Sequence, residues 1–358
     1  MQERRNGKTM NCKTKIYLSQ SFSPYENIAW EKYITATLPP DTVALFLWQN
    51  ADTIVIGRNQ NVWKECRVSD FLTDGGKIAR RLSGGGAVYH DIGNLNFTFA
   101  AHESLYSVPK QLSVIGKALL PFGVEALVSG RNDLTVADGR KFSGNAFYSV
   151  KAPDGQGQNR CHHGCILISA DTGRMAKFLN VSKEKLQSKG VASVRSRVVN
   201  LPALSDQITP KSLSESLLSA FAASYGADAT PQWQNTDVTL LSSEDAKHIA
   251  DDTAFFRSDA WLYGRPMDFT DSFAARFPFG SIECFFAVKD GTVADCRVYS
   301  DCMAETAAPA LENAFIGCPY ATHDLSIAAE RALASLALPE ELSQEMQKAV
   351  STLLQNNI

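Results

Sequence analysis

The chain has 358 residues, of which 44% are hydrophobic and 20% are charged, and its formal net charge is −3. This length and composition are typical of a globular protein with one large domain or two. A charge so close to zero gives no general attraction for nucleic acid or an anionic membrane, so we expect neither as a partner. No apolar run approaches the roughly 18 residues that a membrane-spanning helix needs.

The cysteines and the first residues bear on the cellular compartment. Eight cysteines in a chain of this length do not form a disulfide framework, so we expect reduced thiols in a cytoplasmic protein. The first residues contain several Lys and Arg and few apolar side chains. Because they lack the apolar core of a secretory signal, we predict a flexible tail over residues 1–14, with a short organelle presequence as the alternative.

Apolar residues at helical or alternating spacing predict the elements of the first half of the chain. We expect a helix, three strands and a second helix, over residues 25–38, 44–48, 53–56, 94–101 and 108–122 in turn. Ser107 can cap the second helix and Gly123 can end it. The adjacent Asp138 and Gly139 predict a tight hairpin turn soon afterwards.

The second half of the chain begins with a strand expected over residues 165–169. A helix then opens at Thr209 and Pro210 and runs to Tyr225, where Gly226 can stop it. The polar stretch over 227–236 predicts a surface connection. Beyond it we expect two strands around an Asp-Gly turn and then three helices, over residues 281–288, 292–299, 305–317, 324–336 and 340–356.

Two arginines that lead into a run of glycines are the most informative feature of the chain. Arg80 and Arg81 are followed, after Leu82 and Ser83, by the glycines at 84–86. A backbone without side chains beside fixed cations can wrap closely around an anion, so the motif predicts a phosphate or carboxylate cradle. A plain turn between strands is the alternative. The GxxxxGK[ST] pattern of a P-loop is absent, and a tyrosine at 89 stands where the dinucleotide fingerprint needs its third glycine.

A second cluster surrounds the predicted hairpin turn. Asp133 precedes the turn and Lys141 follows it, so paired strands would bring their side chains together. A partly enclosed ammonium at this place can hold a carboxylate and a phosphate together. Asp133 can hold a divalent metal or orient the lysine, and a plain surface ion pair across the hairpin is the alternative.

Cys161, His162, His163 and Cys165 form a third cluster. Zinc sites usually separate two pairs of ligands, whereas these four residues are crowded together and run into a predicted buried strand. Successive side chains in a strand point to opposite faces, so the two histidines cannot both face one ion. We therefore expect His163 to line a pocket and Cys165 to be an inert buried thiol.

Several motifs occur in one order along residues 15–201: FLWQNADTIVIGRNQN, WKEC, RRLSGGGAVYHDIGN, SGRNDL, RKFSGNA, HHG, and GV followed by SVRSRV. In these motifs the chain resembles the lipoate-protein ligase A family, whose wider group contains biotin ligases and octanoyltransferases. Weaker similarity continues to the C-terminus. The resemblance implies an α+β fold, with a large mixed-sheet catalytic domain of biotin/lipoate ligase type over 15–245 and a smaller C-terminal α+β accessory domain over 246–358.

The resemblance also implies an ATP-dependent lipoate–protein ligase. Such an enzyme converts lipoate and ATP, with Mg²⁺, to lipoyl-AMP and passes the lipoyl group to a lysine of a lipoyl domain. The implied acceptors are E2 subunits of 2-oxoacid dehydrogenases and the glycine cleavage H protein, and we expect a monomer. Two anions meet in the first step, so fixed positive charge must offset their repulsion.

The resemblance further implies roles for individual residues. Lys141 is the expected catalytic residue, in contact with the acyl carboxyl and the phosphate, and Asp133 is the expected Mg²⁺ ligand. Residues 183–199 match the family's lid over the adenylate, with a solvated basic loop as the alternative, and the lid residues are Lys189, Gly190, Arg195 and Arg197. The other expected contacts to ATP or lipoyl-AMP are Arg81, Ser83, Gly84, Gly85, Gly86, Ala87, Val88, Tyr89, Asn132, Ser143, Gly144, Ala146 and His163.

Four other functions are alternatives to the ligase. An octanoyltransferase holds its acyl group on a cysteine, but residues 183–199 contain none where some of those relatives place it. A lipoyltransferase that accepts preformed lipoyl-AMP has motifs that overlap with these. A biotin ligase is disfavoured because RRLSGGG replaces its GRGRxGRxW-type loop. A binding protein that merely kept the pocket is disfavoured by the intact Arg81, Lys141 and Asp133.

Overall fold

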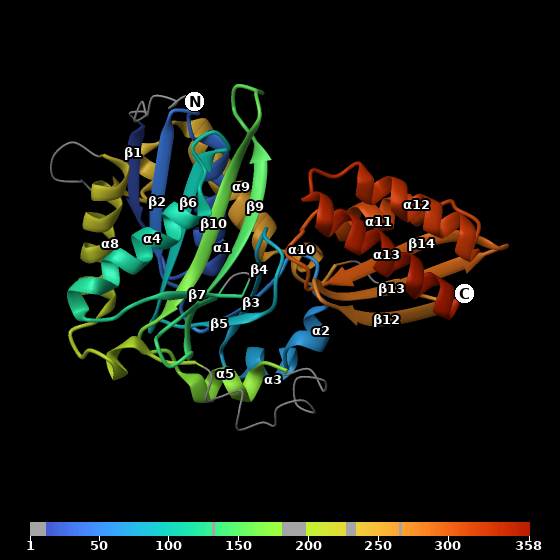
Figure 1. Cartoon of the computed structure of the whole chain (residues 1–358), viewed down its shortest axis with the longest axis horizontal. Coiled ribbons are helices and arrows are strands. Elements are labelled where there is room, and N and C mark those ends of the chain that lie inside the picture. The colour runs from blue at the N-terminus through green and yellow to red at the C-terminus, as the bar shows by residue number, and fades with distance from the viewer. Residues whose placement is uncertain (1–11, 131–132, 181–197, 227–233, 265–266) are drawn as a thin grey trace, which may run out of the picture.

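The computed structural model of the chain describes residues 12–130, 133–180, 198–226, 234–264 and 267–358. They form a large domain and a smaller C-terminal domain, which lie side by side in Figure 1. The α+β fold expected from the sequence is confirmed, with a large mixed sheet in the first domain and an antiparallel sheet in the second.

An eight-stranded mixed sheet forms the centre of the large domain, in the order β11-β1-β2-β6-β10-β9-β8-β7. β1 pairs in parallel with β2 and β11, and the other neighbours are antiparallel. The strands are β1 (Lys13–Leu18), β2 (Thr42–Trp48), β6 (Asn94–His102), β7 (Leu127–Ser129), β8 (Asp133–Thr135), β9 (Lys141–Lys151), β10 (Gln158–Leu167) and β11 (Gln234–Asn235).

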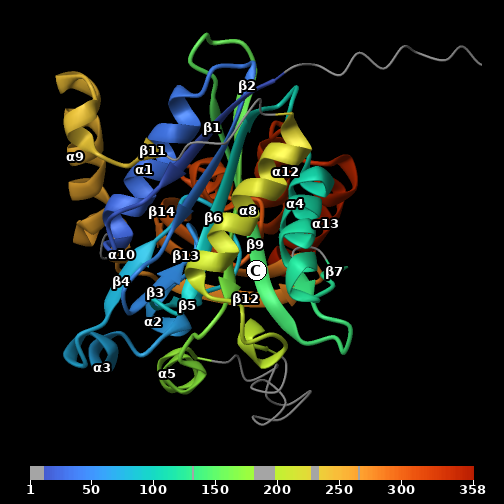
Figure 2. The same ribbon diagram turned by 90° about the vertical axis from the view of Figure 1, so that its left-hand side faces the viewer.

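Two pairs of helices cover the two faces of this sheet. Odd-numbered side chains of β2 pack in one core with α4 (Val108–Leu119) and α8 (Pro210–Tyr225). Its even-numbered side chains pack in another with α1 (Pro24–Thr37) and α9 (Ser243–Arg257). Figure 2 shows α4 and α8 on one side of the strands and α1 and α9 on the other. Because both faces are covered, every residue of β2 is buried.

A second sheet of three strands carries the arginine–glycine motif. Its order is β4-β3-β5, with β3 (Thr53–Ile56) between β4 (Lys77–Arg80) and β5 (Val88–His90). The glycine-rich loop therefore joins the two edge strands of this sheet. A separate apolar core lies under three short helices, α2 (Val62–Glu65), α3 (Val68–Thr73) and α5 (Thr172–Phe178).

The C-terminal domain packs three helices against one sheet. The sheet has the order β12-β13-β14, with bounds Asp271–Phe277, Gly280–Lys289 and Thr292–Ser300. The predicted hairpin is confirmed, because β13 and β14 pair around Asp290 (φ 51°) and Gly291 (φ 73°), both in the left-handed region that such a turn requires. The helices are α11 (Ala307–Phe315), α12 (Thr322–Ala334) and α13 (Glu340–Asn357).

The expected domain boundary at residue 246 falls inside α9. This helix packs on α1 of the large domain, and Phe256 and Trp261 join the same core. α10 (Asp259–Tyr263) follows, and the C-terminal core begins at Phe273. We therefore propose a boundary between residues 264 and 270, because α9 would otherwise be cut away from the core that it closes.

Four other expectations can be compared with the structure. The connection expected over 227–236 does lie at the surface at its end, but residues 234–235 form the exposed edge strand β11 there instead of an irregular segment, and residues 227–233 lie outside the described part of the chain. The tail over 1–14 lies outside it up to residue 11, and β1 already begins at Lys13. All eight cysteines are free, as expected. Among the described residues, no helix is long and apolar enough to cross a membrane.

Candidate active site

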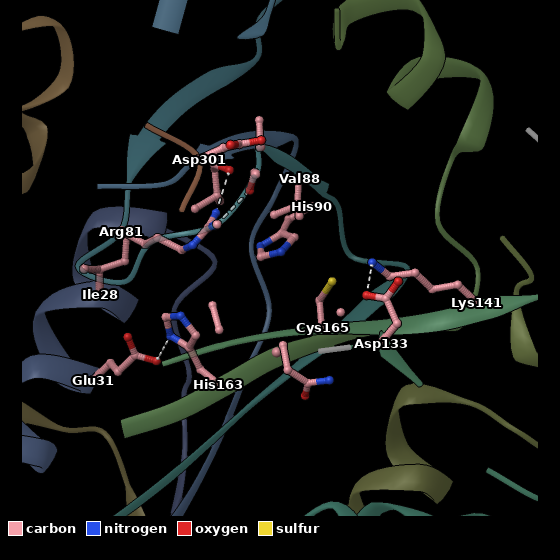
Figure 3. Close-up of a pocket in the computed structure, with 18 of the residues that line it drawn as sticks. Ile28, Glu31, Arg81, Val88, His90, Asp133, Lys141, His163, Cys165 and Asp301 are labelled. Atoms are coloured by element: carbon pink, nitrogen blue, oxygen red, sulfur yellow. Dashed lines mark hydrogen bonds and ion pairs between the residues drawn. The ribbon is translucent and has the colours of Figure 1, made fainter. Parts of the chain in front are cut away.

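The three clusters predicted from the sequence meet around one cavity of about 330 Å³ (Figure 3). Its walls come from α1, the loop between β4 and β5, the hairpin of β8 and β9, and strands β2, β3, β5 and β10. The lining residues are Ile28, Glu31, Trp48, Val55, Arg81, Gly85, Gly86, Ala87, Val88, His90, Asp133, Lys141, Gly144, Asn145, Ala146, His163, Gly164, Cys165 and Asp301. Only the last of these belongs to the C-terminal domain.

Arg81 is a buried cation held by the loop that follows it. Its Nε donates to Ser83 Oγ at 3.0 Å, and its Nη2 donates to the carbonyl oxygens of Gly84 at 2.7 Å and Gly86 at 2.8 Å. Nη1 donates to the Val55 carbonyl at 3.2 Å. Burial lowers the pKa of Arg81 to about 10, so the guanidinium stays charged at neutral pH.

The glycine run gives this arginine its close backbone partners. Gly85 has φ 87°, a left-handed conformation that strains other residues. A Cβ on Gly84 would clash with the carbonyl oxygen of Cys302, which approaches from the C-terminal domain. The same carbonyl accepts a hydrogen bond from the Gly85 amide at 3.2 Å. The glycines therefore serve both the cavity and the contact between the domains.

Lys141 and Asp133 form the ion pair expected across the hairpin. Lys141 Nζ lies 2.7 Å from Asp133 Oδ1, and each side chain is 36% exposed. Gly139 makes the turn with φ 84°. The end of the Lys141 side chain lies against Gly144, and a Cβ added at Gly144 would lie only 2.8 Å from Nζ. The hairpin thus places a partly exposed cation and a carboxylate together at the cavity wall.

The two adjacent histidines point to opposite faces of β10, as predicted. His163 lines the cavity, and its Nδ1 lies 2.8 Å from Glu31 Oε1. His162 lies in the opposite core, where it contacts Gln111 of α4 and Asn145 of β9. Burial lowers the pKa of His162 to about 3, so it is neutral at physiological pH.

Comparison with protein families identifies the large domain. Residues 23–222 match the lipoyl protein ligase A/B catalytic domain. The chain belongs to this family. Residues 266–351 separately match the C-terminus of bacterial lipoate protein ligases, which agrees with a boundary after α10.

Solved structures support the same fold. The chain is similar to LipL1 of P. falciparum in complex with lipoate, with 27% identity over 95% of this chain and 99% of that chain and a TM-score of 0.78. A bipartite lipoate protein ligase of Thermoplasma acidophilum, solved with its E2 lipoyl domain, matches at 20% identity over 72% and 98%, with a TM-score of 0.60. Lipoate-protein ligase A bound with ATP matches at 18% over 70% and 99%, with a TM-score of 0.58.

The site residues that were expected from the sequence fall into three groups in the structure. Those that line the cavity are Arg81, Gly85, Gly86, Ala87, Val88, Asp133, Lys141, Gly144, Ala146 and His163. Four others lie behind the lining: Gly84 contacts Cys302, Ser83 and Ser143 are buried, and the Tyr89 side chain points into the core below β3. Asn132 and the lid residues Lys189, Gly190, Arg195 and Arg197 lie outside the described residues.

Nine residues that line the cavity were not among the expected site residues: Ile28, Glu31, Trp48, Val55, His90, Asn145, Gly164, Cys165 and Asp301. Four of them, Glu31, Trp48, His90 and Asp301, bring polar or aromatic side chains from elements that the three predicted clusters do not include or end before. Glu31 gave one signal, since it stands near Ile28 and Ile34 on the buried side of α1. His90 follows the glycine motif, and burial, followed by the charge of Arg81, lowers its pKa to about 3. It therefore offers a neutral imidazole beside the buried guanidinium.

The cysteines of the third cluster also differ from expectation. Cys165 is not fully buried, and it lines the cavity between the neighbouring strands. Burial nevertheless raises the pKa of its thiol above the usual value. Cys161 has ligand atoms near Glu31 and His163, within 4.8 Å of one another. Burial raises the Cys161 pKa well above normal, and a protonated thiol is a poor metal ligand.

Proposed function

We propose that this protein is a lipoate–protein ligase that activates lipoate with ATP to lipoyl-AMP and transfers the lipoyl group to a lysine of a lipoyl domain. One observation carries the proposal: two cations on different elements, Arg81 and Lys141, line the same cavity beside a glycine-rich loop. The family membership and the likeness to LipL1 in complex with lipoate support it.

The first step joins a lipoate carboxylate oxygen to the α-phosphorus of ATP, and pyrophosphate leaves. Both reactants are anions, and in a cavity their repulsion is larger than in water. Arg81 is fixed by four hydrogen bonds and offers positive charge without reorganisation. Lys141 is the more exposed cation, and we assign to it the contact with both the carboxylate and the phosphate.

The cavity also offers a slot for the acyl chain. Its apolar lining comes from α1, from strands of both sheets and from the end of the glycine-rich loop, namely Ile28, Trp48, Val55, Ala87, Val88 and Ala146. An aliphatic chain that enters there leaves water at a gain of about 0.8 kcal/mol for each buried CH₂ group. The slot therefore positions the carboxylate end for reaction.

Mg²⁺ would be held by Asp133, whose carboxylate is a hard oxygen ligand of the kind that this ion prefers. The side chain is partly exposed at the cavity wall, and its Oδ1 is the atom that contacts Lys141. When bound, the ion would neutralise charge on the phosphates. The ion pair with Lys141 agrees with this role, because the Asp133 carboxylate already binds one cation and could bind Mg²⁺ in place of the ammonium.

In the second step the acceptor lysine amine attacks the acyl carbonyl of lipoyl-AMP, AMP leaves, and the amine loses a proton. Water competes with the amine, so the adenylate must be shielded. We propose that residues 183–199, with Lys189, Gly190, Arg195 and Arg197, cover it. We further propose E2 subunits and the glycine cleavage H protein as acceptors for a monomeric cytoplasmic enzyme.

One observation favours a second candidate, an octanoyltransferase with a cysteine-bound acyl intermediate. Cys165 lines the cavity that Lys141 also lines, so a thiol is within the site. Against this, burial raises the pKa of Cys165, which reduces the thiolate fraction that such a reaction needs. The ligase therefore remains the better-supported function.

The intact mass of an apo lipoyl domain tests these functions together. The domain is incubated with the protein and free lipoate, with and without ATP and Mg²⁺. The ligase predicts a gain of one lipoyl group only when ATP is present. Transfer from added lipoyl-AMP, without transfer from lipoate and ATP, would identify a lipoyltransferase. Transfer only from octanoyl-acyl carrier protein would identify the octanoyltransferase.

A further inference from the structure

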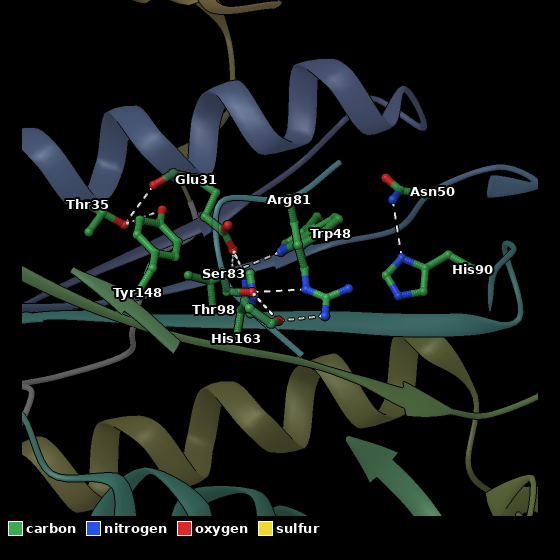
Figure 4. Close-up of polar contacts among 11 residues, drawn as sticks. Glu31, Thr35, Trp48, Asn50, Arg81, Ser83, His90, Thr98, Tyr148 and His163 are labelled. Carbon is green, nitrogen blue, oxygen red and sulfur yellow. Dashed lines mark hydrogen bonds and ion pairs between the residues drawn. The ribbon is translucent and has the colours of Figure 1, made fainter. Parts of the chain in front are cut away.

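A continuous chain of hydrogen bonds connects α1 to the buried arginine of the cavity (Figure 4). Glu31 Oε1 lies 2.8 Å from His163 Nδ1, and His163 Nε2 lies 2.7 Å from Ser83 Oγ. Ser83 Oγ in turn accepts a hydrogen bond from Arg81 Nε at 3.0 Å. Four side chains from three parts of the chain thus form one relay, which we define as Glu31, His163, Ser83 and Arg81.

The relay is anchored at its carboxylate end. Thr98 Oγ1 donates to Glu31 Oε1 at 2.6 Å, and Trp48 Nε1 donates to Thr98 Oγ1 at 3.1 Å. Glu31 is completely buried, and Thr98 is almost so. In the tautomer with a proton on His163 Nδ1 and a free lone pair on Nε2, the donors of the relay all point toward the Glu31 carboxylate. Such alignment strengthens each bond through polarisation, and the low dielectric of the interior adds to this.

The relay solves an electrostatic problem at Arg81. Among the described residues this buried guanidinium forms no direct ion pair, and its recorded partners are carbonyl oxygens and a hydroxyl. A carboxylate in direct contact would neutralise the charge that an anionic ligand needs. Glu31 compensates the buried charge from a distance, and the relay reaches the guanidinium only at Nε, through Ser83, so it places no carboxylate on Nη1 or Nη2.

We propose that Glu31 is a positioning residue for the nucleotide: it acts through His163 and Ser83 to hold Arg81 in the orientation that binds the phosphate of ATP and lipoyl-AMP. This inference rests on the proposed function, because it needs an adenylate ligand at Arg81. The inference gives an acidic residue a favourable effect on the binding of an anion. A direct effect of its charge would have the opposite sign, so the two effects can be told apart by experiment.

The test is the affinity of the full-length protein for ATP and for lipoyl-AMP, measured by titration calorimetry on wild type and on Glu31→Gln. If Glu31 acted only as a nearby negative charge, its removal would tighten the binding of both anions. The positioning role predicts the opposite sign, with binding weakened about tenfold, the size expected for a lost hydrogen bond to a charged group. Equal or tighter binding by Glu31→Gln overturns the inference.

Two further variants separate positioning from general damage to the fold. Ser83→Ala breaks the relay at its middle, so we expect a similar loss of affinity for ATP and lipoyl-AMP. This variant tests the relay even if Glu31→Gln does not fold. In the double variant the two losses should not add, because either one already uncouples Arg81. Thr35→Val is the control: it removes an equally buried hydroxyl one turn further along α1. This hydroxyl donates to the backbone carbonyl of Glu31 and accepts from the Tyr148 hydroxyl, but it bonds no side chain of the relay, so both affinities should be unchanged.

The affinities of the wild type distinguish this inference from the proposed function. If the wild type binds ATP and lipoyl-AMP and the variants bind them equally well, Glu31 has no positioning role, but the proposed ligase function still stands. If the wild type binds only lipoyl-AMP, the protein does not activate lipoate with ATP, but the relay can still be tested with lipoyl-AMP as the ligand. Wild type that binds neither overturns both proposals. Fully additive losses would show that Glu31 and Ser83 act separately, which also overturns the relay.

Discussion

The two cations of the cavity differ in how firmly the structure holds them. Arg81 is buried and bonded to the loop around it, whereas Lys141 makes one ion pair and is 36% exposed. A fixed cation suits a group that keeps its place, such as the phosphate. A partly exposed cation at the cavity wall can contact two ligands at once, so it suits the place where the carboxylate and the phosphate meet. We therefore assign the larger share of catalysis to Lys141.

Lys141→Ala should reduce ATP–pyrophosphate exchange at saturating lipoate by at least about 100-fold, the usual effect of losing one electrostatic contact to a transition state. Lys151→Ala is the control, because Lys151 lies exposed at the other end of the same strand. Loss of exchange in Lys141→Ala alone supports the assignment. Near-normal exchange in Lys141→Ala would show that another group activates the carboxylate.

The sequence identifies Arg81 and Lys141 because each stands in a local pattern, a glycine run in one case and a hairpin turn in the other. Glu31 has no such pattern. Its partner His163 lies 132 positions away, and only the packing of α1 against the large sheet brings the two together. A buried glutamate on a helix is consistent with many roles, so its function follows only from the tertiary contacts.

At the scale of the elements, local signals predict what local interactions stabilise. The helix at 210–225 has the expected limits, because Thr209 and Ser212 form a capping box and Gly226 adopts φ 72°. For β9, only the start was predicted, as the strand that pairs across the turn at Lys141, and its full extent to Lys151 was not, although it is the longest strand of the large sheet. Its sequence contains Gly144 and Asn145 and no clean alternation, so it depends on pairing with β8 and β10.

His162 links three elements and should make their stability depend on pH. It is buried between β10, α4 and β9 with a pKa of about 3, against 6.5 for an unperturbed histidine. Between these values the unfolded chain binds the proton more tightly, so stability is full above pH 6.5 and falls as the pH drops toward 3. One such group contributes a slope of up to about 1.4 kcal/mol per pH unit.

His162→Gln should flatten this slope in the free energy of unfolding, measured by urea denaturation from pH 7 to pH 4. The absolute stability of the variant does not matter for this comparison, because only its change with pH is tested. His248→Gln is the control, since that histidine is exposed on α9. An unchanged slope in His162→Gln would mean that other groups cause the loss of stability in acid.

At the scale of the whole molecule, the two domains meet at the glycine-rich loop of the cavity. The Cys302 carbonyl accepts a hydrogen bond from the Gly85 amide, and the Ser300 amide donates to the Asn59 carbonyl at 2.8 Å. Asp301, between these two residues, lines the cavity. The C-terminal domain is therefore part of the site wall, and its docking depends on the absence of a side chain at Gly84.

Gly84→Ala should loosen this docking, because the new Cβ would overlap the Cys302 carbonyl, a backbone group that cannot rotate away. We expect faster proteolysis between residues 264 and 270 and a larger radius of gyration in solution scattering. Gly86→Ala is the matched control, since a Cβ there meets nothing within 4 Å and φ is not positive. Equal proteolysis of both variants would show that the contact between Gly84 and Cys302 does not hold the domains together. Their arrangement would then depend on other contacts, such as the hydrogen bond between Ser300 and Asn59.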